Sequence, residues 1–180
     1  LFLAPEFRDA FLYRDESGRI LYDCLLKKNT KLQSLEEFLV AMKKKKAIRF
    51  ETEHPSGREL IYELDGTDKA DAISIRVNTW GHAGIHVRTT ADFIEVQTHV
   101  LWTDEFVDRR DVLEFTICAD KVPAGRRHGD LILQTPYEKK VIHITAHNRI
   151  GEKERKIQRA RKKAIAMAIR MFLSYQEKRV

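Results

Sequence analysis

Residues 111–118 read Asp-Val-Leu-Glu-Phe-Thr-Ile-Cys, an alternation of apolar and polar side chains. The stretch continues through a loop at residues 119–129, then Asp-Leu-Ile-Leu-Gln-Thr at residues 130–135, and a last segment at residues 137–146. Apart from the loop, each of the three segments is short and rich in aliphatic or β-branched residues, and turn residues separate them. The stretch therefore predicts three consecutive strands of an antiparallel sandwich.

The alternation within this stretch indicates which face of each strand is buried. Leu113, Phe115 and Ile117 share one side of their strand, as successive residues of a strand point to opposite faces. Pro123 has no amide donor, so the first strand should end before it. In the middle segment Leu131 and Leu133 are predicted to face inward, and Ile132 between them outward.

Upstream, the same period-two pattern recurs at intervals of roughly ten residues from Ala47 onward, which predicts a sandwich of seven or eight strands. The fold class expected is mainly β: an antiparallel, immunoglobulin-like β-sandwich with flanking helices. The side chains predicted to fill its core are Ile48, Phe50, Leu60, Tyr62, Ile73, Ile75, Val77, Ile85, Val87, Ile94, Val96, Leu113, Phe115, Ile117, Leu131, Leu133, Ile142 and Ile144.

Residues 117–146, with Ala124-Gly125 followed by Gly129-Asp-Leu-Ile-Leu, carry a resemblance to a known family. They resemble the last hairpins of bacterial immunoglobulin-like domains of the BACON type, and the resemblance extends more loosely over about residues 47–148. It implies a β-sandwich and a non-catalytic module of a larger bacterial protein. It implies no binding residues.

Helices are expected on both sides of the sandwich, which divides the chain into residues 1–46, 47–148 and 149–180. Pro5 fits the first turn of a helix, and Glu16-Ser-Gly-Arg19 is expected to break it. Ser34 and Glu37 form a capping box that predicts a helix beginning at Ser34. That helix should end in the solvated lysines at residues 43–46.

Residues 152–178 repeat apolar side chains every three or four residues, which predicts one long helix. Its second half is apolar around more than half of its circumference and should require cover. We expect it to pack on the helical segment around Leu35, Phe38 and Leu39, or on another copy of the chain as a homodimer. Further helices downstream are expected to complete the cover.

Composition limits the classes of protein that fit. The chain has 180 residues, 43% of them hydrophobic, and lacks the run of about 18 apolar residues that a membrane span needs. Cys24 and Cys118 are expected to be buried free thiols rather than a disulfide, and a cytoplasmic location is slightly favoured. The net charge is +6, but residues 149–180 alone carry 11 Lys/Arg and 3 Asp/Glu, so the basic character belongs to the terminal helix.

No set of residues has the spacing of a catalytic motif, and we expect neither an enzyme nor a cofactor or metal. Two histidine pairs, His82 with His86 and His143 with His147, share strand parity and should face outward as surface side chains rather than zinc ligands. Cys118 is expected to be structural rather than paired with His128. The carboxylates of Asp104, Glu105, Asp108 and Asp111 are expected to serve in turns.

The function expected is a non-catalytic interaction or structural module, with two alternatives. Trp80 and Trp102 are candidate stacking platforms for a glycan in a carbohydrate-binding module, although core or rim packing is the commoner role. Nucleic acid or another anionic surface is a further candidate partner, through the basic half of the terminal helix: Lys153, Arg155, Lys156, Arg159, Arg161, Lys162 and Lys163.

Overall fold

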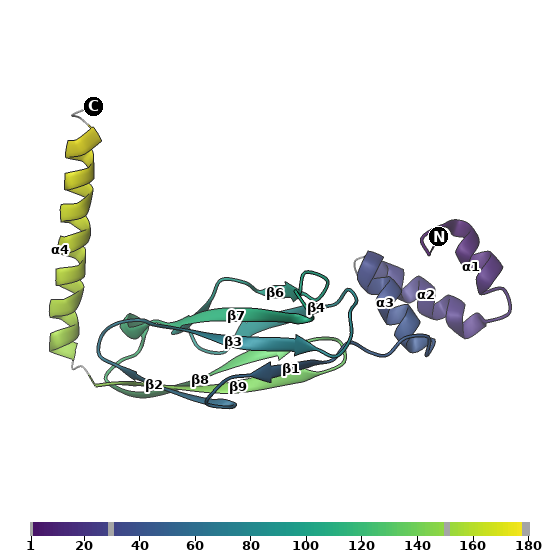
Figure 1. The fold of residues 1–180 in the computed structure, drawn as a ribbon, viewed down its shortest axis with the longest axis horizontal. Coiled ribbons are helices and arrows are strands. Elements are labelled where there is room, and N and C mark those ends of the chain that lie inside the picture. Colours follow the sequence, from purple (N-terminus) through teal and green to yellow (C-terminus); the bar gives the residue numbers. More distant parts are fainter. Residues whose placement is uncertain (1, 29–30, 150–151, 178–180) are drawn as a thin grey trace.

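The computed structural model describes residues 2–28, 31–149 and 152–177. Three short helices come first, two β-sheets occupy the middle of the molecule, and a single long helix projects from the far end (Figure 1). The described chain is thus mainly β with flanking helices, as the sequence predicts.

The helices before the sheets enclose a small aromatic core of their own. Phe2, Leu12, Tyr22 and Phe38 are buried, and the ring of Phe2 lies within 5.1–5.4 Å of the rings of Phe7, Tyr22 and Phe38. The Tyr22 hydroxyl donates a 2.7 Å hydrogen bond to the Phe2 carbonyl, which satisfies the phenol inside this core. The three helices are α1 (Pro5–Phe11), α2 (Glu16–Lys28) and α3 (Lys31–Ala41).

Two of the helix boundaries predicted from the sequence are wrong. Glu16 and Gly18 do not break a helix but lie in the first turn of α2. Ser34 is not the N-cap of α3, because α3 begins at Lys31 and the Ser34 side chain is fully buried. Its hydroxyl donates to the Leu25 carbonyl at 2.9 Å, so the hydroxyl joins α3 to α2 instead of starting a helix.

The first sheet has four strands in the order β1-β3-β7-β5, all paired antiparallel. The central pair is the longest, with Lys69 opposite Ile117 at one end and Arg76 opposite Arg110 at the other. The strands are β1 (Phe50–Glu53), β3 (Lys69–Val77), β5 (Ile94–Val96) and β7 (Arg110–Ile117).

The second sheet has five strands in the order β2-β9-β8-β4-β6. All its pairs are antiparallel except β2 with β9, which run parallel with Leu60 opposite Ile144. Two successive strands, β1 and β2, therefore lie at the edges of different sheets. The strands are β2 (Glu59–Leu64), β4 (Gly84–Thr89), β6 (Val100–Trp102), β8 (Gly125–Gln134) and β9 (Lys139–Asn148).

The core between the sheets confirms the predicted strand parity. All predicted core side chains are buried except Tyr62 and Val96, which are partly buried and pack against the core. Leu131 and Leu133 face inward, which confirms the parity predicted for that strand. Phe93 and Leu101 are also buried, although the alternation did not identify them. The loop predicted at residues 119–129 is shorter than expected, because β8 already begins at Gly125.

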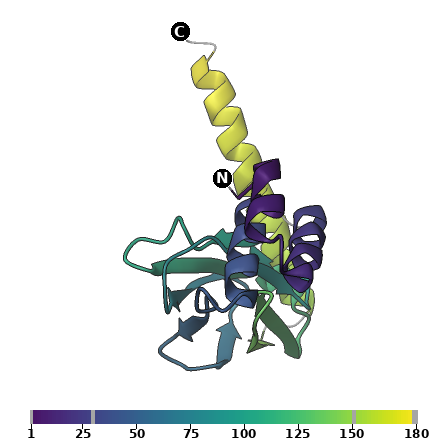
Figure 2. The same ribbon diagram turned by 90° about the vertical axis from the view of Figure 1, so that its right-hand side faces the viewer.

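The terminal helix α4 (Glu152–Glu177) confirms the predicted element but not its packing. It projects from the end of the sandwich opposite to α1–α3 (Figures 1 and 2). The expected packing on the segment around Leu35, Phe38 and Leu39 is therefore wrong for the single chain. In the part of α4 whose side chains are described, Ile165, Met171 and Phe172 are each more than half exposed.

Candidate functional site

The exposed surface of α4 is a candidate interaction surface. Apolar side chains project along its second half, and every described side chain between Ala160 and Tyr175 is exposed. The exposed large apolar residues of the helix are Ile157, Ile165, Met167, Ile169, Met171, Phe172, Leu173 and Tyr175. Surfaces of this kind usually mark sites of interaction.

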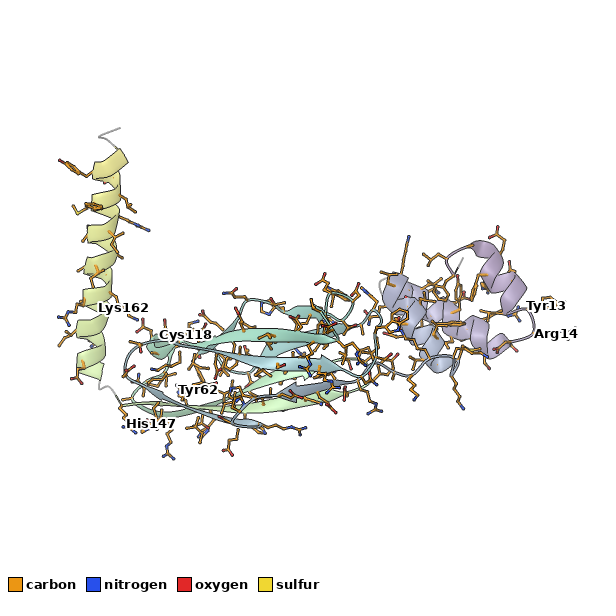
Figure 3. All side chains as sticks on the ribbon, viewed as in Figure 1. Tyr13, Arg14, Tyr62, Cys118, His147 and Lys162 are labelled. Carbon is orange, nitrogen blue, oxygen red and sulfur yellow. The ribbon has the colours of Figure 1, made fainter. Side chains whose placement is uncertain are left out.

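The basic residues predicted for an anionic partner lie in the first half of the same helix. The side chains of Lys156, Arg161, Lys162 and Lys163 are exposed, and Lys162 projects from α4 in Figure 3. Lys153, Arg155 and Arg159 belong to α4 by their backbone, but their side chains lie outside the described residues. In the described residues no helix has the length and apolar character needed to cross a bilayer.

The two tryptophans lie near the junction between α3 and the sheets, and each has one ring face covered. Trp80 is 77% exposed, and the Lys45 ammonium lies over its ring at 5.0 Å. The ring of Trp102 is stacked on His82, with 4.7 Å between centroids and 14° between planes. One face of each ring is therefore closed to a glycan.

The sequence predicts Lys45 to be a solvated residue at a helix end. This prediction is wrong, because Lys45 is part of the junction. Its ammonium is bound to the Glu36 carboxylate at 2.6 Å, and both side chains are less than one-fifth exposed. Glu36 also accepts a 3.3 Å hydrogen bond from the His82 amide. Gly81 has φ +151°, and an added Cβ would collide with Lys45 and Glu36. These contacts hold α3 against the loop that follows β3.

A cluster that the sequence did not identify joins the two sheets. Asp71 on β3 accepts hydrogen bonds from the Tyr62 hydroxyl on β2 at 2.6 Å and from His54 Nε2 at 3.1 Å. The Ser56 amide donates to His54 Nδ1 at 3.0 Å, so Nδ1 is the acceptor and Nε2 carries the proton given to Asp71. Figure 3 places Tyr62 within the sandwich.

The electrostatics of this cluster follow from burial and hydrogen bonding. Burial, with the neighbouring Asp71 carboxylate, strongly raises the pKa of Tyr62. Burial also tends to raise the pKa of Asp71, but the hydrogen bonds from Tyr62, the Ala72 amide and His54 outweigh it and lower the pKa overall. A hollow of about 440 Å³ lies beside Asp71 and is also lined by Glu114 and Gln97. Both ring nitrogens of His54 are occupied, which suits a role in joining the sheets.

The histidines named from the sequence do not form a metal site in the described part of the chain. His143 is bound to Asp130 at 2.8 Å and His147 to Glu63 at 3.1 Å on the outer face of the second sheet. His86 is exposed, as expected. His82 does not face outward from a strand, because β4 begins only at Gly84, and its side chain is 17% exposed beside Asp104.

Cys118 and His128 are not paired with each other. Burial, followed by a hydrogen bond to Glu95, raises the pKa of the Cys118 thiol to about 11, which makes it a poor nucleophile. His128 Nδ1 instead lies 3.0 Å from the Thr145 hydroxyl. Both cysteines are free, as expected, but neither is fully buried: Cys24 is exposed and Cys118 is half-buried.

Three of the four carboxylates named from the sequence lie between β6 and β7, and Asp111 lies on β7 itself. Asp104 lies 3.0 Å from His82, and Asp111 accepts a 2.8 Å hydrogen bond from the Val112 amide. Asp108 has φ +50° in the tight turn before β7. Glu105 donates its amide to the Trp102 carbonyl at 3.0 Å. Asp104, Glu105 and Asp108 lie in the turn region expected from the sequence, whereas Asp111 is a residue of β7.

Comparison with solved structures finds proteins of distant likeness. A protein of unknown function from Porphyromonas gingivalis W83 shares 17% identity over 54% of this chain and 46% of its own, with a TM-score of 0.41. A FixG-related protein from Vibrio parahaemolyticus shares 6% over 58% of this chain and 96% of its own, with a TM-score of 0.38. The chain thus spans less than half the length of the Porphyromonas protein.

No curated protein matches the chain. The family model described as "Family of unknown function (DUF5717) N-terminal" matches residues 1–180, the full length of the sequence. The chain therefore belongs to the DUF5717 N-terminal family, whose function is unknown.

Proposed function

We propose that this chain is a non-catalytic interaction or structural module of a larger bacterial protein, with α4 as its interaction element. The observation that carries the proposal is the exposure of α4, where eight large apolar side chains are each more than half exposed. A helix that is apolar on most sides is normally covered by protein. Cover from outside the sandwich fits this placement, because α4 projects away from it (Figure 1).

The strand order supports an immunoglobulin-like sandwich as the rigid support for this helix. Sheets of this class place their first, second, fifth and fourth strands together, in the order ABED, and oppose them with a sheet built on the third, sixth and seventh. When β2 and β6, the edge strands of the second sheet, are left out of the count, the remaining seven strands are β1, β3, β4, β5, β7, β8 and β9. The order β1-β3-β7-β5 then corresponds to ABED, and β9-β8-β4 corresponds to the opposing sheet. Together with the BACON-type likeness of residues 117–146, this order favours a scaffold over a catalytic domain.

The polar contacts favour the same role. The cluster of His54, Tyr62 and Asp71 joins β2 to β3, and its ring nitrogens and hydroxyl are already hydrogen-bonded. The raised pKa of Cys118 disfavours its thiolate at neutral pH. Neither group is arranged as an activated nucleophile with a free base.

The proposal can be tested by photo-cross-linking in cells that produce the natural protein. A benzophenone amino acid placed at Ile165 on α4 should form adducts with another polypeptide or another copy. The same probe at Ile61 or Val112 is a matched control, because these residues are comparably exposed but lie on the outer faces of the two sheets. Adducts no stronger at Ile165 than at the controls would exclude α4 as the interaction element.

A second candidate function is binding of nucleic acid or another anionic surface through the first half of α4. It is favoured by the exposed cations of Lys156, Arg161, Lys162 and Lys163 and by the surplus of 8 positive charges in residues 149–180. Fluorescence anisotropy with labelled DNA and RNA would test it. Tight binding that falls steeply with salt and is lost on replacing Lys162 and Lys163 by Gln would support it. Binding unchanged by salt would exclude it.

A further inference from the structure

The apolar face of α4 has a symmetric arrangement of side chains. Five residues, which we call the α4 face, follow one another at intervals of 3, 4, 4 and 3 residues: Ile157, Ala160, Ala164, Ala168 and Met171. The intervals are the same when read from either end, and Ala164 is the centre. At 3.6 residues per turn these five side chains lie on one side of the helix along its length.

Larger apolar side chains border this face, and all of them are exposed. Ile165 and Phe172 lie along one border, and Tyr175 extends the face toward the end of the helix, each more than half exposed. The three alanines leave little side chain between two backbones, so a second helix can approach closely there, while Ile157 and Met171 flank the contact. The α4 face thus has the shape needed to receive another helix.

The charge along α4 selects the orientation of a second copy. Residues 149–163 contain 8 Lys/Arg and 2 Asp/Glu, whereas residues 164–177 contain only Arg170 and Glu177. Parallel pairing would place the two basic halves side by side. Antiparallel pairing places each basic half against the neutral half of its partner. It also separates the two copies of Arg161, which lies beside the face, by about 9 Å along the axis.

The position of α4 in the molecule allows this arrangement. The helix projects away from the sheets, so its far end is distant from its own sandwich (Figures 1 and 2). Two copies paired antiparallel would carry their sandwiches at opposite ends of the helix pair. A helix of 26 residues is about 39 Å long, which leaves space between the two sandwiches.

We infer that the chain forms a two-fold homodimer through antiparallel pairing of α4, centred on Ala164. In this dimer Ala164 meets Ala164 of the second copy, Ala160 meets Ala168, and Ile157 meets Met171. The contact is isologous, the same surface serving on both copies, so it closes on itself and does not propagate. The inference rests on the proposed function, because it names the partner of the same helix.

Cysteine cross-linking tests the register directly. In a chain with Cys24 and Cys118 replaced by Ser, Ala164→Cys should form a disulfide-linked dimer on mild oxidation, because its two copies face each other. Ala160→Cys alone and Ala168→Cys alone should not, but an equimolar mixture of those two variants should link to each other. Ala166→Cys, two residues and about 200° around the helix from Ala164, is the matched control and should not cross-link.

The outcomes separate this inference from the proposed function. Self-linking of Ala160→Cys and Ala168→Cys would show parallel pairing and overturn the inference. The chain could sediment as a monomer while the photoprobe at Ile165 captures a different polypeptide in cells. That result would overturn the homodimer and leave α4 as the interaction element. A monomer that sediments only with phosphatidylserine-containing vesicles would overturn the homodimer and assign the same helix to lipid. A monomer without photoproducts at Ile165 would overturn both.

Discussion

Tyr62 and Tyr137 are two partly buried phenols with opposite hydrogen-bonding environments. The Tyr62 hydroxyl donates to the Asp71 carboxylate at 2.6 Å, whereas the buried Tyr137 hydroxyl has no protein partner among the described residues. We predict that Tyr62→Phe lowers the free energy of unfolding by about 1–3 kcal/mol, because the acceptor is charged. Tyr137→Phe should be neutral or slightly stabilising. Urea unfolding of both variants checks the pair, and equal losses would contradict the prediction.

The Asp71 carboxylate makes stability depend on pH in a defined direction. Its pKa in the folded chain lies below the unfolded value of about 3.9, so its ionised form stabilises the fold above that pH. This contribution is lost as the pH falls through the lowered folded pKa. We predict that Asp71→Asn is less stable than the natural sequence by about 1–2 kcal/mol at pH 7.

The difference between the two proteins should shrink as the pH is lowered from about 5 toward 2. The other carboxylates with lowered pKa values, such as Asp65 and Glu95, are present in both proteins and cancel. Urea unfolding at a series of pH values measures the difference directly. A gap that stays constant over this range would show that the Asp71 charge does not stabilise the fold.

The sequence predicts single residues well where one period governs them. Leu113, Phe115 and Ile117 alternate on β7 and are all buried. The cluster around Asp71 could not be predicted in this way. Asp71 has the inward parity of Ile73, but its partners Tyr62 and His54 come from β2 and from a turn. Only the packing of the two sheets brings them together.

At the level of elements, Gly81 lies where α3 meets the sheets. Its φ of +151° strains any side chain, and an added Cβ would displace the ends of the Lys45, Glu36 and Ile48 side chains. Gly57 also has a positive φ, +74°, but nothing lies within 4 Å of an added Cβ. We predict that Gly81→Ala costs about 2–3 kcal/mol, backbone strain plus displaced contacts, and Gly57→Ala about 1 kcal/mol, strain alone.

Urea midpoints of the two glycine variants give the comparison. Because Lys45 lies over the Trp80 ring, the Trp80 side chain should become more mobile only in Gly81→Ala. A lower fluorescence anisotropy of Trp80, measured in a Trp102→Phe background, would show this. Equal costs for the two substitutions would mean that α3 does not depend on this close approach.

The boundaries of elements were less predictable than their existence. The interval from Ser34 to Glu37 has the pattern of a capping box, yet Ser34 lies inside α3 and its hydroxyl binds the Leu25 carbonyl. A local pattern cannot show that a serine is buried against another helix. The C-terminal helix was predicted accurately, because a 26-residue element with a sustained period of three or four leaves few alternatives.

At the level of the whole molecule, the sequence shows that α4 needs cover but not where the cover lies. The amphipathic pattern is satisfied equally by the aromatic core around Phe38, by a second copy or by another protein. The placement of α4 at the opposite end from α1–α3 removes the first option for the single chain (Figure 1). A second copy or another protein then remains to cover the α4 face.

Sedimentation equilibrium of two matched alanine variants tests whether α4 pairs through Ala164. Ala164 and Ala166 are both exposed on α4, and Glu is a good helix former, so Ala164→Glu and Ala166→Glu should keep the helix and change its charge equally. We expect the natural sequence and Ala166→Glu to sediment as dimers and Ala164→Glu to sediment as a monomer. The circular dichroism of both variants should equal that of the natural sequence. A natural sequence that is monomeric at all concentrations, or an Ala166→Glu variant that dissociates as readily as Ala164→Glu, would contradict this pairing.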